Sequence, residues 1–232
     1  MSVISEPPQK QSFDFGKPFA FVFNDPNWIA KILIGGLFYL ASIVLIGPIF
    51  ILGYCARLTR NVIAGEPQPL PEWNDLGEYF SEGLRLFCVA LLYSIPIIVL
   101  FGVVIIPPVI VAALSRSNHY NAMDQWGSGF MGCFSCLLFP LSLGLAFWMP
   151  GALLMAVVER RFGAAFEFSR IWEFIRANLG NFLLAFVVYY VARFVAGFGL
   201  ILFCIGVIFT GFWAMLVATY GYAEVYRLSN VR

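Results

Sequence analysis

Charged residues are scarce in this chain of 232 residues: 12% are Asp, Glu, Lys or Arg, while 61% are hydrophobic. Soluble domains carry about 25% charged and about 45–50% apolar residues. A soluble core of this size could not bury so much apolar surface, so lipid is expected to be the solvent for much of the chain. The net charge of +1 also provides no basic stripe for phosphates, which excludes nucleic acid as a partner.

Reactive and metal-binding side chains are also few. His119 is the single histidine, so the chain has no histidine to pair with a nucleophile, and metal sites need three or four ligands. The five cysteines are scattered and form no disulfide framework. Residues 1–10 lack the apolar run of a signal peptide, so the first membrane segment is expected to direct targeting. We expect no enzyme activity, no metal and no cofactor.

Long apolar stretches are what the chain does have. They are residues 32–56, 86–114, 134–158 and 181–226. One helical crossing of a bilayer needs about 20 apolar residues, so the last of these stretches is long enough for two crossings. The sequence therefore predicts an all-α polytopic membrane protein with five or six membrane helices.

The division of the chain follows from these stretches. Residues 1–12 are expected to form a polar tail, and residues 13–228 a single multi-pass membrane domain. Pro107-Pro108 is expected to end the second membrane helix near residue 106, because proline interrupts the helical hydrogen bonds. Residues 115–132 are expected to form a polar loop.

The first apolar stretch allows two interpretations. Its 25 residues would reach about 38 Å as one tilted helix, or Gly47-Pro48 could turn the chain into a re-entrant hairpin. The hairpin places twelve basic residues on one side and Arg116 opposite, whereas the single span gives nine against four, with Arg193 inside the membrane in both cases. The stronger bias slightly favours the hairpin. Both interpretations place the C-terminus in the cytoplasm.

A short motif occurs twice. Phe15-Gly-x-x-Phe19-x-Phe21 matches Phe162-Gly-x-x-Phe166-x-Phe168, and a tryptophan follows each copy. With the hairpin interpretation, the chain divides into three units, each with an aromatic cytoplasmic surface helix and then a membrane hairpin. The surface helices would be 13–28, 72–85 and 162–177, the membrane hairpins 29–60, 86–158 and 180–226, and the repeat units approximately 13–60, 70–158 and 162–227.

Two of the expected surface helices are amphipathic. Apolar residues at helical spacing form one face, and charged residues, including the acids of 72–82, form the other, which is expected to face water. Such helices lie in the membrane interface, where their apolar faces contact lipid or a partner. The residues expected on the apolar faces are Trp73, Leu76, Phe80, Phe168, Ile171, Trp172 and Ile175.

Three further residues are candidates for function. Arg193 lies inside an apolar stretch, where an ionisable group is either functional or extends to the membrane surface, depending on where the hairpin turns between residues 197 and 206. Cys133 and Cys136 form a C-x-x-C pair, a spacing that supports thiol–disulfide exchange. The simpler interpretation of this pair is packing of small residues, because the chain offers no second pair to pass electrons on.

One segment is distinctive enough to suggest a family. Arg60-Asn61-Val62-Ile63-Ala64-Gly65-Glu66 is followed by Leu70-Pro71-Glu72-Trp73-Asn74-Asp75, and Asn24-Asp25-Pro26 and Lys31–Gly36 precede it. Over about residues 13–228 the chain resembles a family of bacterial and archaeal multi-pass membrane proteins, the domain of unknown function numbered four thousand and thirteen. The resemblance implies a prokaryotic cytoplasmic-membrane protein and carries over no catalytic residue.

The sequence thus favours an integral inner-membrane protein that acts as a non-enzymatic structural, scaffold or assembly subunit. A small transporter or channel subunit is the alternative, because repeats and broken helices are typical of that class. An intramembrane enzyme acting on a thiol or lipid is the third hypothesis. The expected partners are the lipid bilayer and either another membrane protein or a second copy of the chain.

Overall fold

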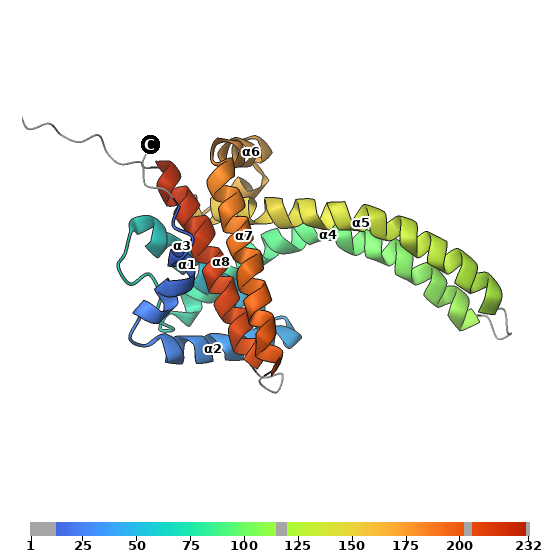
Figure 1. The fold of residues 1–232 in the computed structure, drawn as a ribbon, viewed down its shortest axis with the longest axis horizontal. Helices are drawn as coiled ribbons and strands as arrows, with labels where there is room; N and C mark the ends of the chain where they lie inside the picture. Colours follow the sequence, from blue (N-terminus) through green and yellow to red (C-terminus); the bar gives the residue numbers. More distant parts are fainter. Residues whose placement is uncertain (1–12, 115–119, 202–205, 231–232) are drawn as a thin grey trace, which may run out of the picture. The chain divides into compact units, whose positions relative to one another are not determined.

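The computed structural model describes residues 13–114, 120–201 and 206–230, and in this part of the chain every regular element is a helix (Figure 1). The elements are α1 (Lys17–Ala20), η1 (Phe21–Asn24), α2 (Trp28–Leu40), η2 (Ala41–Val44), α3 (Gly47–Ala64), α4 (Leu76–Leu114), α5 (Tyr120–Val158), η3 (Phe162–Phe166), α6 (Phe168–Ala177), α7 (Leu179–Gly197), η4 (Phe198–Ile201) and α8 (Gly206–Asn230), where η denotes a 3-10 helix.

Four stretches of helix in the described residues are long and apolar enough to cross a membrane: Leu76–Val103, Leu138–Val158, Leu179–Ile201 and Gly206–Ser229. A fifth is added if Lys17–Asn24 and Trp28–Val44, which bend by 108° at their junction, are counted as one broken span. The all-α polytopic prediction is confirmed, and only the higher count reaches the five or six helices expected.

The described residues divide into two compact units, one formed by residues 13–87, 151–201 and 206–230, and the other by residues 88–114 and 120–150. In the first unit, α8 is the central helix: it lies beside α7 and also packs on α2 and α3 (Figure 1). Phe212 and Leu216 of α8 are fully buried, as are Ala185 and Ala192 of α7. Such small alanines let two membrane helices approach closely.

The chain turns between α2 and α3. Leu45 adopts the left-handed conformation (φ 62°), and α3 begins at Gly47 with Pro48 in its first turn, a position that proline tolerates. A Cβ on Gly47 would lie 1.9 Å from the Phe38 carbonyl oxygen, so only glycine fits this turn. Residues 28–64 are therefore two helices, as the hairpin interpretation requires, and not one continuous span.

In the second unit, α4 and α5 run alongside each other (Figure 1), and Trp148 Nε1 donates a hydrogen bond to the Tyr93 hydroxyl at 3.3 Å. Two expectations were wrong here. The helix does not end near residue 106 but continues through Pro107-Pro108 to Leu114, and α5 begins at Tyr120, so most of the expected loop 115–132 is helical. Neighbouring groups in membrane proteins can satisfy the backbone groups that a proline frees.

The expected surface helices take different forms. The stretch 13–28 contains only the short α1 and η1, 72–85 runs into the continuous helix α4, and 162–177 consists of η3 and the amphipathic α6. The two Phe-Gly-x-x-Phe copies do make the same local contact, with ring centroids 5.6 Å apart for Phe15–Phe19 and 5.3 Å apart for Phe162–Phe166. The internal repeat itself stays a prediction.

Candidate functional site

Residues 65–75, here called the proline segment, connect α3 to α4. Gly65 ends α3 in the left-handed conformation (φ 76°), and the prolines that follow prevent a new helix. Side chains from α2, α3 and α4 bind consecutive carbonyl groups of this segment. Asn61 donates to Pro69 O at 2.9 Å, Lys31 to Leu70 O at 3.0 Å, Tyr54 to Pro71 O at 2.8 Å, and Tyr79 to Glu72 O. The segment is therefore held rigidly although it is irregular.

Lys31 is the most constrained of these side chains. It is 5% exposed, and its Nζ lies 2.7 Å from Asp25 Oδ2 and 2.7 Å from Glu72 Oε1, in addition to the contact with Leu70 O. All three ammonium donors are used, which compensates the cost of burying the charge. Asp25 is buried as well and also accepts a hydrogen bond from the Asn27 backbone N–H at 2.8 Å.

Trp73 is held by both a hydrogen bond and ring stacking. Its Nε1 donates to the Lys31 carbonyl at 3.1 Å, and its ring stacks on Tyr54 and Phe38 at centroid distances of 4.2 and 4.9 Å. Phe212 of α8 lies 6.1 Å away. Trp73, expected on a partner surface, is therefore half-buried against the core of the first unit.

The helices α3 and α4 cross at two glycines. A Cβ on Gly53 would lie 1.9 Å from Tyr79 O, and one on Gly83 would lie 1.7 Å from Ile49 O, so the two backbones are in direct contact. Charged residues flank this crossing: Arg57 pairs with Glu78 at 2.7 Å and Arg60 with Glu82 at 2.5 Å. Glu78 and Glu82, expected to face water, are thus bound to another helix.

A polar cavity of about 340 Å³ lies beside these contacts. Its lining includes Asp25, Lys31, Arg57, Asn61, Glu72 and Asp75, so the beginning of α2 and the end of α3 both border it. The other end of this helical pair, at the turn, exposes large apolar residues, with Ile43 81% and Leu45 67% exposed. Among the described residues, no group of three or more His, Cys, Asp or Glu side chains is arranged to hold a metal ion.

The remaining candidate residues are dispersed. Arg193 lies one turn before the end of α7 and close to Tyr39 of α2, whose ring packs on Gly211 of α8. Cys136 is exposed on α5 and is a free thiol. The side chain of Cys133 lies outside the described residues, so the structure does not test the C-x-x-C pair.

The apolar face of α6 is divided between core and surface. Ile171 and Ile175 are buried and pack where a Cβ on Gly151 would lie 3.3 Å from each, whereas Phe168 and Trp172 are 56% and 54% exposed. Leu76 and Phe80 at the start of α4 are also exposed. The exposed part of the expected partner surface therefore consists of four of its seven residues: Leu76, Phe80, Phe168 and Trp172.

The ion pairs around the proline segment were not predicted as contacts. A signal for them exists: Arg57 and Arg60 share a helix face at i, i+3 spacing, and Glu78 and Glu82 share another at i, i+4. The two sets have opposite charge and are separated by a short proline-rich connection, which brings them together. The contacts of Lys31 with Asp25 and Glu72 carry no comparable signal, because they depend on the bend between α1 and α2.

These helices and their largely exposed apolar surfaces define a polytopic membrane protein. The family model for a protein of unknown function, DUF4013, matches residues 37–205. The chain therefore belongs to the DUF4013 family. The match includes the proline segment, whereas Asp25, Lys31 and α8 lie outside it. No curated protein and no solved structure matches the chain.

Proposed function

We propose that this chain is a non-enzymatic scaffold or assembly subunit that binds another membrane protein through the exposed aromatic side chains of α6. The observation that carries the proposal is the division of α6 into two faces. Ile171 and Ile175 fix the helix to its own chain, while Phe168 and Trp172 on the outward face are more than half exposed. A few residues carry most of the binding energy of a protein interface, and tryptophan is enriched among them.

The position of α6 supports a partner that is itself in the membrane. Only Asn178 separates the end of α6 from Leu179, where a candidate membrane span begins, so α6 lies at the level of that span's end. Some of its charged residues form ion pairs within the chain: Arg170 pairs with Glu167 at 2.8 Å and with Glu159. Phe168 and Trp172 are therefore the large apolar side chains of α6 that are exposed for a partner to contact.

The use of charge elsewhere in the first unit also favours a structural role. Lys31, Arg57, Arg60 and Arg227 each form ion pairs within the chain. These groups rigidify the fold, and a rigid frame is what a scaffold requires. The attraction within a buried ion pair is largely offset by the cost of removing both charges from water, so such pairs fix geometry without adding much stability.

We place the protein in the cytoplasmic membrane with its C-terminus inside, following the excess of basic residues on one side. One contact supports this arrangement. Arg85 donates to the Arg160 carbonyl at 2.7 Å, so two basic residues from distant parts of the sequence lie together. A C-terminal green fluorescent protein fusion should fluoresce, and a C-terminal alkaline phosphatase fusion should be inactive; the reverse pattern would refute this orientation.

Purification of the chain in nanodiscs without crosslinking, followed by mass spectrometry, tests the scaffold proposal. A stoichiometric membrane protein should co-purify with the wild type and be lost from the double variant Phe168→Ser, Trp172→Ser. Phe162→Ser is the matched control, because Phe162 is 40% exposed but lies on η3, outside the outward face of α6. Absence of a partner from the wild type, or its retention by the double variant, would contradict the proposal.

A transporter or channel subunit is the second candidate, favoured by the sharp bend before α2 and by the polar cavity at the open end of the α2–α3 pair. Broken helices that border a polar cavity recur in transporters. Flux measurements in liposomes would test this candidate, with Arg193→Ala as the variant. Flux that is abolished by this substitution would favour transport, and a wild type without flux would remove the candidate.

The thiol version of an enzyme has its own test. If Cys133 and Cys136 exchange disulfides, the double variant Cys133→Ser, Cys136→Ser should lose any phenotype that the wild-type gene rescues. If the double variant behaves as the wild type does, this version is refuted.

A further inference from the structure

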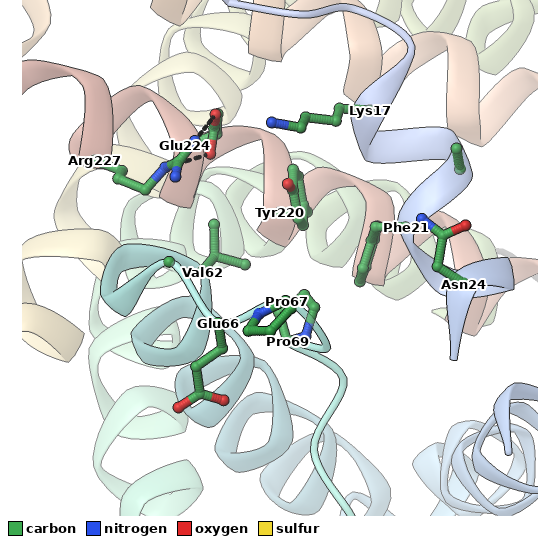
Figure 2. A pocket seen from close by; sticks show the side chains of 12 residues that line it. Lys17, Phe21, Asn24, Val62, Glu66, Pro67, Pro69, Tyr220, Glu224 and Arg227 are labelled. Carbon is green, nitrogen blue, oxygen red and sulfur yellow. Dashed lines mark hydrogen bonds and ion pairs between the residues drawn. The ribbon is translucent and has the colours of Figure 1, made fainter. Parts of the chain in front are cut away.

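A second cavity lies at the C-terminal end of α8 and shares Glu66 with the one beside Lys31. It has a volume of about 250 Å³ and is bordered by α1, by the beginning of the proline segment and by α8 (Figure 2). A neighbouring, more open hollow shares Lys17, Glu224 and Arg227 with it. These three charged residues therefore border both the cavity and the open hollow.

Glu224 and Arg227 form a fixed pair inside this region. The Glu224 carboxylate is buried, and it accepts hydrogen bonds from Arg227 Nε at 2.9 Å and from Arg227 Nη2 at 2.5 Å. This pair leaves Nη1 of Arg227 without a hydrogen bond to the described residues. Glu224 therefore acts as a positioning residue, because it sets the plane in which the free edge of the guanidinium lies.

Two further donors point toward the same place. Lys17 extends from α1 with its ammonium group directed at Glu224, and the Tyr220 hydroxyl is on the same side (Figure 2). Lys17 forms no ion pair with a described carboxylate. The Tyr220 ring is held by stacking on Phe21 at a centroid distance of 4.4 Å, so its hydroxyl has a fixed position.

Two cations, Lys17 and Arg227, and three carboxylates, those of Glu224, Glu66 and Asp14, border the cavity and the open hollow. Lys17 and Arg227 each contribute one positive charge, and Glu224 contributes one negative charge. Glu66 also borders the cavity, but its carboxylate points away from the other charged groups (Figure 2). Asp14 borders the open hollow, where its carboxylate accepts the Gly16 N–H at 2.9 Å.

We propose that Lys17, Tyr220 and Arg227 form a binding site for a phosphate group, carried by an anionic phospholipid or by a phosphorylated solute. Charged nitrogen donors form the strongest hydrogen bonds to phosphate oxygens, and a guanidinium edge matches their geometry. The position of the site in the chain favours the lipid: Glu224 and Arg227 lie in the last turns of the candidate span Gly206–Ser229, and the end of a span of this length is expected to reach the headgroups. The site is separate from the outward face of α6 and goes beyond the proposed function.

Native mass spectrometry of the purified full-length chain tests the site, with phosphatidylglycerol as the probe and a galactolipid, which lacks phosphate, as the comparison lipid. The wild type should bind phosphatidylglycerol in preference to the galactolipid, and Lys17→Gln should weaken this binding about tenfold, the value of one charge-assisted hydrogen bond. Lys17 is exposed and unpaired, so this variant should fold. Arg176→Gln, which removes an exposed positive charge from α6, should bind as the wild type does.

A second measurement separates the two sources of phosphate. Inorganic phosphate, compared with chloride at equal ionic strength, should raise the thermal midpoint of the detergent-solubilised wild type, but not of Lys17→Gln, if the natural ligand is a soluble phosphate. A preference for phosphatidylglycerol without this shift assigns the site to the lipid. If neither ligand discriminates the wild type from Lys17→Gln, the proposed site is refuted.

Discussion

Two candidate spans of this chain have very different surroundings. Over their most apolar stretches, 56% of the span Gly206–Ser229 in α8 is buried within the chain, against 17% of the span Leu76–Val103 in α4. The buried helix contains Ala214, Thr219 and Glu224, whereas the exposed one presents Ile98 and other large aliphatic side chains. High hydropathy therefore marks contact with lipid, and a helix packed among other helices can contain small and polar residues instead.

The largest loss of stability is expected for a residue that is buried within the chain. Lys31→Met should lower the free energy of unfolding by about 4 kcal/mol, because it leaves the buried carboxylate of Asp25 without its partner. Unfolding by sodium dodecyl sulfate in mixed micelles measures the change. Arg176→Met, which removes an exposed cation, serves as the control and should change stability little. Equal effects for the two variants would show that the Lys31 pair does not hold the proline segment.

A pair of phenylalanines tests the comparison with one side chain in two surroundings. Phe212→Ala in α8 should lower stability by about 3 kcal/mol, because its fully buried ring leaves a cavity. Phe101→Ala in α4 should lower the free energy of unfolding by only about 0.3 kcal/mol, because lipid can take the place of a ring that is 48% exposed. The same micelle titration measures both. A large loss for Phe101→Ala would mean that protein, not lipid, covers this part of α4.

The glycine crossing of α3 and α4 is expected to have a somewhat smaller effect. Gly83→Ala should destabilise by about 2 kcal/mol net, because the new Cβ meets Ile49 O at 1.7 Å and only part of the cost is offset by higher helix propensity. Gly77→Ala on the same helix has open space and should be neutral or stabilising. Circular dichroism during thermal unfolding would measure both. A neutral Gly83→Ala would show that the two backbones are farther apart than described.

The smallest effect is expected at the surface, where α5 ends. The hydrogen bond from Arg161, with the charge of Arg170, holds the pKa of the Glu159 carboxyl below its ordinary value of 4.5. Because the folded-state pKa is lowered, the stabilisation is present above about pH 4.5 and is lost as pH falls through the folded-state value. When the pH is lowered from 7 to 4, the thermal midpoint of unfolding should thus fall slightly more for the wild type than for Glu159→Gln. An identical fall in both would contradict a stabilising role.

Much of the fold could be predicted from composition, but the candidate site could not. Apolar stretches predict membrane helices because each residue that faces lipid must be apolar. Gly47-Pro48 predicts the turn because few residues fit its backbone conformation. The continuation of α4 through Pro107-Pro108 depends on neighbours that replace the lost hydrogen bonds, and no local pattern encodes these neighbours. The position of Trp73 likewise depends on residues that are distant in the sequence. Its ring was expected on a partner surface, but Tyr54 and Phe38 cover it.

Labelling of the unmodified chain from the lipid side shows directly which of the two helices contacts the bilayer. In nanodiscs that contain a phospholipid with a photoactivatable diazirine in its acyl chain, irradiation and peptide mass spectrometry report which helices contact lipid. We predict strong labelling of residues 91–106 in α4 and little labelling of residues 212–225 in α8. Labelling of α8 as strong as that of α4 would show that α8 is not enclosed by its own chain.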